Sequence, residues 1–144
     1  MKTNTLTIMG AVLVAMMASA SAESALQIAK AKDVTGKMES GACESFAKDL
    51  FQRMDRAGVE AYHIIYDWQN LDLRKQAGAH ALIVFRDERG RYYGVDNMTW
   101  KPVWLQGNTP REWVKFFSGM DTHTQVVSQV ATHTVGGDHR LASR

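Results

Sequence analysis

The sequence has little cysteine, little proline and no strong excess of charge of either sign. A single cysteine in 144 residues excludes a disulfide within the chain. Lysines and arginines are spread among acidic residues, as in the segment 86–89, and the formal net charge is only +2. Nucleic-acid binding normally requires a clustered basic face, so this balance argues against a nucleic-acid partner. The sequence shows no internal repeat and no second domain.

The one long apolar stretch lies at the N-terminus. Lys2 precedes an apolar stretch over residues 6–17, and both Ala18-Ser19-Ala20 and Ala20-Ser21-Ala22 have the small-x-small pattern of a cleavage site. The stretch is short for a membrane anchor. We therefore predict a signal peptide over residues 1–22, a periplasmic or secreted mature protein, and no membrane association after cleavage.

The sequence after residue 22 predicts one α+β domain over residues 23–118. It also predicts a C-terminal tail over residues 119–144 that is partly mobile. Within the domain, an amphipathic helix that carries the cysteine is expected to pack on a small antiparallel sheet. Its apolar residues recur at helical spacing, with Ser40 as the expected N-cap and Gly58 as the C-cap.

The other elements are predicted from runs of apolar residues and from the turns between them. Residues rich in β-branched and aromatic side chains predict strands over 61–68, 79–85, 91–96 and, at an edge, 99–105. Residues 87–90 are expected to form the turn of a hairpin. Short helices are expected over 25–32 and 111–117, and an edge strand over 126–135. The inward-facing residues of the last helix are expected to be Trp113, Phe116 and Phe117.

Three residues have the order and setting that a thiol nucleophile requires. Cys43 falls in the first turn of the predicted helix, where unpaired backbone N–H groups and the helix dipole favour a thiolate. His80 directly precedes an apolar strand, so its ring can reach a helix N-terminus and take the thiol proton. The hairpin register is expected to place His80 opposite position 97, beside Asp96, whose carboxylate can orient the imidazole.

Each of these residues also has an ordinary structural interpretation. Cys43 can be a small buried apolar residue, and Asp96-Asn97 is a common turn pair. His63 lies inside the first predicted strand and is better explained as a packed sheet residue than as the base. No compact metal site is expected from the spacing of three later histidines, which are His123, His133 and His139. We predict neither a metal nor a cofactor.

The motifs around the three residues resemble those of a known enzyme family. Cys43-Glu44 at a helix start, His80-Ala81-Leu82-Ile83-Val84 at a strand and Gly94-Val95-Asp96-Asn97-Met98 after the next strand are similar to motifs of the bacterial transglutaminase-like cysteine peptidases. The resemblance covers roughly residues 41–105. It implies a papain/transglutaminase-like core, with Cys43 as nucleophile, His80 as general base and then acid, and Asp96 as the orienting carboxylate. Ala42 stands where adhesin-releasing members carry an aspartate, so calcium binding is not implied.

The sequence therefore predicts an exported thiol hydrolase that cleaves a peptide or isopeptide amide of a protein or peptide substrate through an acyl-enzyme. Two alternatives remain open. A transglutaminase or protein-glutamine deamidase uses the same triad, and a non-catalytic binding or accessory module can use the same fold. The substrate cleft is expected between the helix and the sheet, with the loop 70–79 as one wall. Trp100 is predicted to cover the imidazole–carboxylate pair and to contact substrate.

Overall fold

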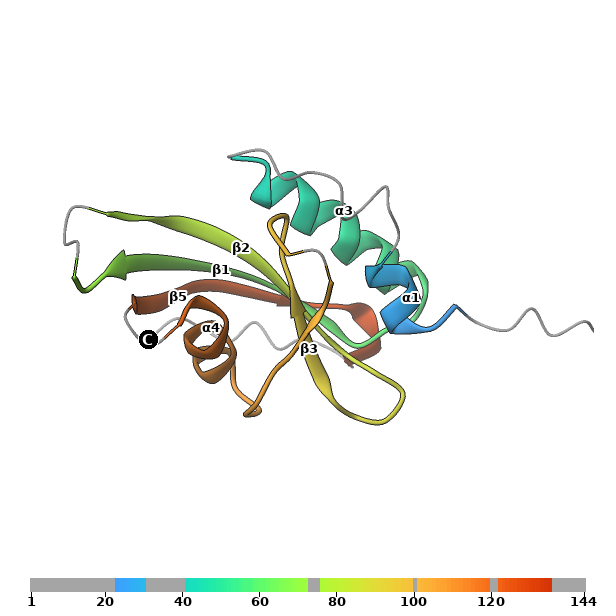
Figure 1. Ribbon diagram of the computed structural model, residues 1–144. Helices are drawn as coiled ribbons and strands as arrows, with labels where there is room; N and C mark the ends of the chain where they lie inside the picture. Colours follow the sequence, from blue (N-terminus) through green and yellow to red (C-terminus); the bar gives the residue numbers. More distant parts are fainter. Residues whose placement is uncertain (1–22, 31–40, 73–75, 100, 120–121, 136–144) are drawn as a thin grey trace, which may run out of the picture.

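The computed structural model describes residues 23–30, 41–72, 76–99, 101–119 and 122–135. Its centre is a five-stranded antiparallel sheet with the strand order β4-β3-β2-β1-β5 (Figure 1). The elements along the chain are α1 (Ala25–Ala29), α3 (Cys43–Arg56), β1 (Ala61–Asn70), β2 (Ala77–Arg86), β3 (Tyr92–Val95), β4 (Val103–Trp104), α4 (Pro110–Ser118), β5 (Thr122–Ala131) and a short 3-10 helix (His133–Val135). The predicted α+β class, with a cysteine-bearing helix on a small antiparallel sheet, is confirmed.

The helix α3 is defined more clearly at its end than at its start. Gly58 adopts a left-handed conformation (φ 69°), which a residue without a Cβ tolerates. Its N–H donates to the carbonyl of Asp55 at 3.0 Å, and the N–H of Val59 donates to that of Met54 at 2.9 Å. This pair of bonds is a Schellman motif, so the predicted C-cap is confirmed. The predicted N-cap is wrong, because Ala42 takes that position without a side-chain cap, and Ser40 lies outside the described residues.

The sheet carries one apolar core on each face. Successive residues of β2 point to opposite faces, so Ala81, Ile83 and Phe85 lie on one side and Leu82 and Val84 on the other. The buried residues of α3 that join the first group are Phe46, Ala47, Leu50 and Met54. The buried residues of α4 that join the second group are Trp113 and Val114. The two helices therefore cover opposite faces of the sheet (Figure 1).

Two predictions about the inner faces needed correction. Ile83 pairs with Val95, which shifts the hairpin register by one residue from the expected pairing with Gly94. Phe116 was expected to face inward but is 46% exposed, whereas Trp113 is buried and Phe117 is partly buried. The reason is that α4 contacts the sheet through one narrow face. The buried residues on that face are Trp113 and Val114.

The strand β5 joins the sheet through β1 and begins four residues earlier than expected. It extends the sheet beyond residue 118, where the domain was expected to end. The segment after β5 is tied to α3, because Asp55 accepts a hydrogen bond from the His133 N–H at 2.8 Å and contacts the ring Nδ1 at 2.6 Å. At the opposite edge of the sheet, β4 has only two residues.

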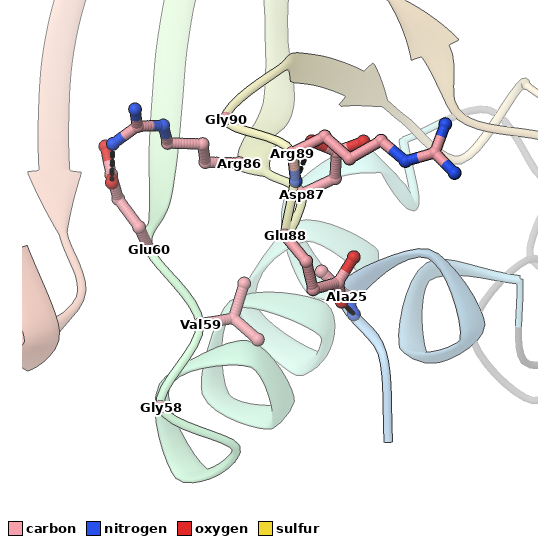
Figure 2. Close-up of a pocket in the computed structure, with 9 residues that line it drawn as sticks. All are labelled: Ala25, Gly58, Val59, Glu60, Arg86, Asp87, Glu88, Arg89 and Gly90. Atoms are coloured by element: carbon pink, nitrogen blue, oxygen red, sulfur yellow. Dashed lines mark hydrogen bonds and ion pairs between the residues drawn. The ribbon is translucent and has the colours of Figure 1, made fainter. Parts of the chain in front are cut away.

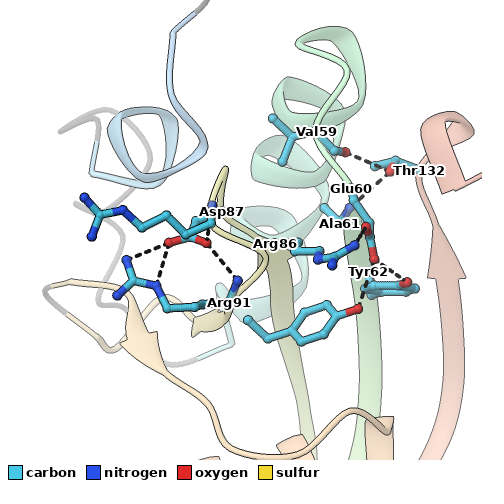
Figure 3. A network of polar contacts seen from close by, with 10 residues as sticks. Val59, Glu60, Ala61, Tyr62, Arg86, Asp87, Arg91 and Thr132 are labelled. Carbon is cyan, nitrogen blue, oxygen red and sulfur yellow. Dashed lines mark hydrogen bonds and ion pairs between the residues drawn. The ribbon is translucent and has the colours of Figure 1, made fainter.

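Polar contacts brace the end of the sheet that carries the hairpin turn (Figure 3). The Glu60 carboxylate accepts hydrogen bonds from the hydroxyls of Tyr62 at 3.0 Å and Tyr92 at 3.1 Å, and from Arg86 Nη1 at 3.2 Å. These bonds link the start of β1 to the end of β2 and the start of β3. They satisfy three polar groups that would otherwise be desolvated beside the aromatic cluster around Trp113.

The predicted hairpin turn is present and is held by Asp87. Its carboxylate accepts from Arg91 Nε at 2.9 Å and Nη2 at 2.8 Å, and from the backbone N–H groups of Arg89 and Arg91. Burial opposes ionisation of Asp87, but these bonds outweigh it and hold the pKa of the carboxyl below its ordinary value. Among the described residues, no helix combines the length and apolarity needed to cross a membrane. The predicted signal peptide over residues 1–22 lies outside them.

Candidate functional site

Cys43 is the first residue of α3, so the predicted first-turn position is confirmed. Its thiol is not in a disulfide and the residue is half-buried. It packs against the core cluster on the α3 side of the sheet. The sulfur therefore combines a helix start with partial access to solvent, as a nucleophile requires.

His80 and Asp96 form a direct hydrogen bond, as their predicted proximity implied. The Nε2 atom of His80 lies 2.8 Å from Oδ2 of Asp96, and the two side chains are 16% and 7% exposed. The other carboxylate oxygen, Oδ1, accepts from the backbone N–H groups of Met98 at 2.9 Å and Thr99 at 2.8 Å. Asp96 in turn donates its own N–H to Thr99 Oγ1 at 3.1 Å. The carboxylate is thus fixed by a tight turn before it contacts the imidazole.

The protonation of the pair follows from these contacts. Burial raises the pKa of Asp96, but the bonds from His80, Met98 and Thr99 outweigh it and leave the pKa below its ordinary value. The carboxylate is therefore ionised at neutral pH and can only accept, so Nε2 of His80 carries the proton. Nδ1 is then the basic nitrogen, and it makes no hydrogen bond within the described part of the chain.

Tyr66 is a further member of the site that the sequence analysis missed. Its ring meets that of His80 edge-on, with centroids 5.8 Å apart and planes at 80°. Burial, and then the charges of Asp96 and Cys43, raise the pKa of Tyr66 to about 12. The hydroxyl is thus within electrostatic range of both the carboxylate and the thiol. Tyr66 lies opposite His80 in the β1–β2 pairing. The contact could be predicted only if the register of these two strands were known.

The structure does not join Cys43 to His80. No hydrogen bond links the two side chains in the described residues. Alternation along β2 puts His80 on the face of Leu82, which packs with α4, whereas Cys43 packs on the α3 face. The β2–β3 pairing ends at Ile83, three residues from His80. Tyr66, whose ring contacts the imidazole, nevertheless lies within electrostatic range of the thiol.

The other histidine of interest, His63, has the structural role expected of it. It is buried in β1 beneath α3, with its ring 6.0 Å from that of Phe51. Its Nε2 atom is buried and has no hydrogen-bond partner among the residues that the structure describes. Burial lowers the pKa of His63, the charge of Glu44 partly opposes this effect, and the charge of Lys48 adds a still smaller lowering. The ring is therefore held neutral as part of the core.

The structure contains two cavities relevant to the predicted cleft. The first, of about 570 Å³, lies between α1, the end of α3 and the hairpin turn (Figure 2). Its charged groups are largely engaged with one another or the backbone: Arg86 pairs with Glu60, and Glu88 accepts from the Ala25 N–H. It lies at the end of β2 remote from His80. The second, of about 460 Å³, lies at the other end of β1, β2 and β5 and includes Ala77 and Gly78 from the predicted wall 70–79.

Trp100, the predicted substrate contact, lies outside the described residues. In the described parts of the chain, no three potential ligand side chains of the kind that bind metals come together. Comparisons of the chain with models of known families, with curated proteins and with solved structures found no significant match.

Proposed function

We propose that this protein is an exported thiol hydrolase with a papain/transglutaminase-like core, which cleaves a peptide or isopeptide amide. The observation that carries the proposal is the hydrogen bond between His80 Nε2 and Asp96 Oδ2. It is made by a fixed carboxylate and leaves Nδ1 as the basic nitrogen. A second observation agrees with it: the Tyr66 ring contacts the imidazole, and the charges of Asp96 and Cys43 both help to raise the pKa of Tyr66.

The reaction requires two proton transfers through Nδ1 of His80. This nitrogen takes the proton of the Cys43 thiol as the sulfur attacks the substrate carbonyl carbon. The imidazolium then gives the proton to the leaving amine as the C–N bond breaks, which leaves a thioester. Water attacks the thioester, with His80 again as the base, and restores the thiol. Asp96 keeps the imidazole oriented and stabilises its charged form in both steps.

Catalysis also requires the thiol to reach Nδ1. Ala42, the N-cap of α3, makes no side-chain capping hydrogen bond, which leaves the first turn less firmly held than one with a side-chain cap. Tyr66 lies beside the ring that the sulfur must approach. The proposal therefore includes a shift of the first turn of α3 toward His80 when substrate binds, since catalytic contacts often tighten only in the complex.

Alkylation of Cys43 tests the proposal without knowledge of the substrate. We expect iodoacetamide to react faster with the folded protein at pH 7 than with the same protein unfolded in denaturant. His80→Ala should remove this difference, whereas the control Lys115→Ala, on an exposed residue of α4, should preserve it. Equal rates for folded and unfolded protein would contradict an activated thiol.

Mass spectrometry of a random peptide mixture then defines the reaction. New peptide termini that require Cys43 would support hydrolysis. Conversion of glutamine to glutamate or cross-linking, with no new termini, would instead support a deamidase or transglutaminase. Mass spectrometry of the protein itself, purified after export, gives the mature N-terminus, which we expect at residue 23.

A non-catalytic binding module is the second candidate. The observation that favours it is that no hydrogen bond joins Cys43 to His80 in the described residues. In that case the His80–Asp96 bond would serve stability alone. The NMR chemical shifts of the His80 imidazole distinguish the two functions: they should change in Cys43→Ala if the thiol and the imidazole interact, and remain unchanged if they do not.

A further inference from the structure

The cavity at the far end of β1, β2 and β5 lies on the same face of the sheet as Cys43. Asp67 pairs with both Ala79 and Gln125, so these three residues share one face. Alternation along β1 and β2 connects that face to Ala81, which belongs to the core under α3. Cys43 packs against the same core. The cavity therefore lies on the face of the sheet that α3 covers.

The distance along the strands suits an extended substrate. Asp67 lies two residues beyond Ile65, which is paired with Ala81. Two residues of a strand span about 7 Å, the repeat between side chains on one face of an extended peptide. A substrate that runs along β1 with one side chain over Ile65 would place the next side chain on that face over this cavity.

The chemistry of the cavity is set by one carboxylate. Asp67 is exposed, and it makes no hydrogen bond or ion pair within the described part of the chain. The other lining side chains are uncharged or are imidazole, among them Trp68, Gln69, His123 and Gln125. An arginine or lysine that would neutralise Asp67 is absent from the lining residues.

Small residues keep the cavity open on the β2 side. Ala77, which pairs with Gln69 on the face of Asp67, lines it there with only a methyl group, and Gly78 adds no side chain. The volume of about 460 Å³ is sufficient for a long side chain together with water.

We propose that this cavity is a substrate subsite that takes a cationic group, namely the side chain of lysine or arginine in a peptide, with Asp67 as its counter-charge. This proposal rests on the proposed function for the position of the scissile bond, but the binding itself does not require catalysis. The paired carboxylate and cation are partly exposed to solvent, so the attraction is moderate and is weakened by salt.

Binding is tested with three acetylated, amidated alanine pentapeptides that carry lysine, norleucine or glutamate at the centre. The Cys43→Ala variant excludes turnover, and backbone amide shifts at Ala77, Gly78, His123 and Gln125 report occupancy. We expect the lysine peptide to bind at least fivefold more tightly than the norleucine peptide, and the glutamate peptide to bind most weakly. Asp67→Asn should remove the preference for lysine, and raising the salt concentration should reduce it.

Asp72→Asn is the matched control, because Asp72 carries the same charge on an exposed position outside the cavity. It should leave the lysine preference intact. Equal binding of the three peptides, binding of none, or an equal effect of the two substitutions would overturn the subsite. Because the alkylation of Cys43 is measured separately, failure of the subsite and failure of the proposed enzyme give different results.

Discussion

Asp96 contacts His80 diagonally across the end of the β2–β3 ladder, with Oδ2 and Nε2 2.8 Å apart. Ile83 and Val95 are the last pair of this ladder, so one further step places Asp96 beside Leu82 rather than beside His80. Diagonal neighbours on one face remain within reach of a long side chain. The imidazole spans the gap, while Thr99 and Met98 hold the carboxylate from the other side.

Asp96→Asn should disable the imidazole while preserving the shape of the turn. The substitution removes a charge-assisted bond, which contributes about 1.5–3 kcal/mol, so Cys43 alkylation should slow by about tenfold or more. Thr99→Val removes only the hydroxyl that accepts from the Asp96 N–H and should have a smaller effect. An alkylation rate that stays at the wild-type value in Asp96→Asn would show that the pair does not act on the thiol.

The same substitution predicts a pH dependence of stability. The pKa of Asp96 in the folded protein lies below its ordinary value of 3.8. The stabilisation is therefore fully present above that value and is lost as the pH falls through the folded pKa. Denaturant unfolding should show the wild type more stable than Asp96→Asn at pH 7, with the difference shrinking toward pH 2. A constant difference across this range would contradict the assignment.

His63→Leu should weaken the dependence of stability on pH, in a pH range above the one in which Asp96 acts. Burial depresses the folded pKa of His63 below its ordinary value of 6.5, so the unfolded chain binds this proton first. The wild type should therefore lose stability as the pH falls below about 6.5, and the leucine variant should lose less. Thermal unfolding between pH 7.5 and pH 5 measures the slope. Gln52→Ala, on the exposed side of α3, removes no titratable group and is the control that should retain the wild-type slope.

Tyr66→Phe and Tyr66→Ala separate the hydroxyl of Tyr66 from its ring. The phenylalanine variant keeps the edge-on contact with His80 and should retain the fold and the His80–Asp96 bond. The alanine variant removes a ring that is only 3% exposed and should lose about 3–5 kcal/mol of stability. Denaturant unfolding, together with the imidazole NMR signals of His80, checks both. A change in the chemical shifts of the His80 imidazole in Tyr66→Phe would show that the Tyr66 hydroxyl acts directly on the imidazole.

Leu50→Ala tests whether α3 is anchored by its apolar face. Leu50 is fully buried between α3 and the sheet, so its truncation should cost about 2–5 kcal/mol. Gln52→Ala, on the exposed side of the same helix, should change stability by less than about 0.5 kcal/mol. Chemical denaturation of both variants gives the comparison. Similar losses in the two would indicate that α3 does not pack as described.

Local sequence determined the elements that rest on periodicity and on chain termination. The helix over Cys43–Arg56 follows from apolar residues at helical spacing and from Gly58, which alone in that stretch tolerates the left-handed C-cap. The hairpin follows from two apolar strands around the polar turn 87–90, held by Asp87. These features depend on residues within a few positions of one another, so they can be predicted without the fold.

Tertiary structure alone decided the features that depend on which face a residue occupies. A shift of one residue in strand pairing moves every side chain to the other face. The sequence therefore predicted that His80 and Asp96 are close, but not that Cys43 packs under α3 without a hydrogen bond to His80 in the described residues. The contact of Tyr66 with His80 depends on the β1–β2 register. The exposure of Phe116 likewise depends on how α4 rotates against the sheet, because packing between distant segments, and not local periodicity, sets that rotation.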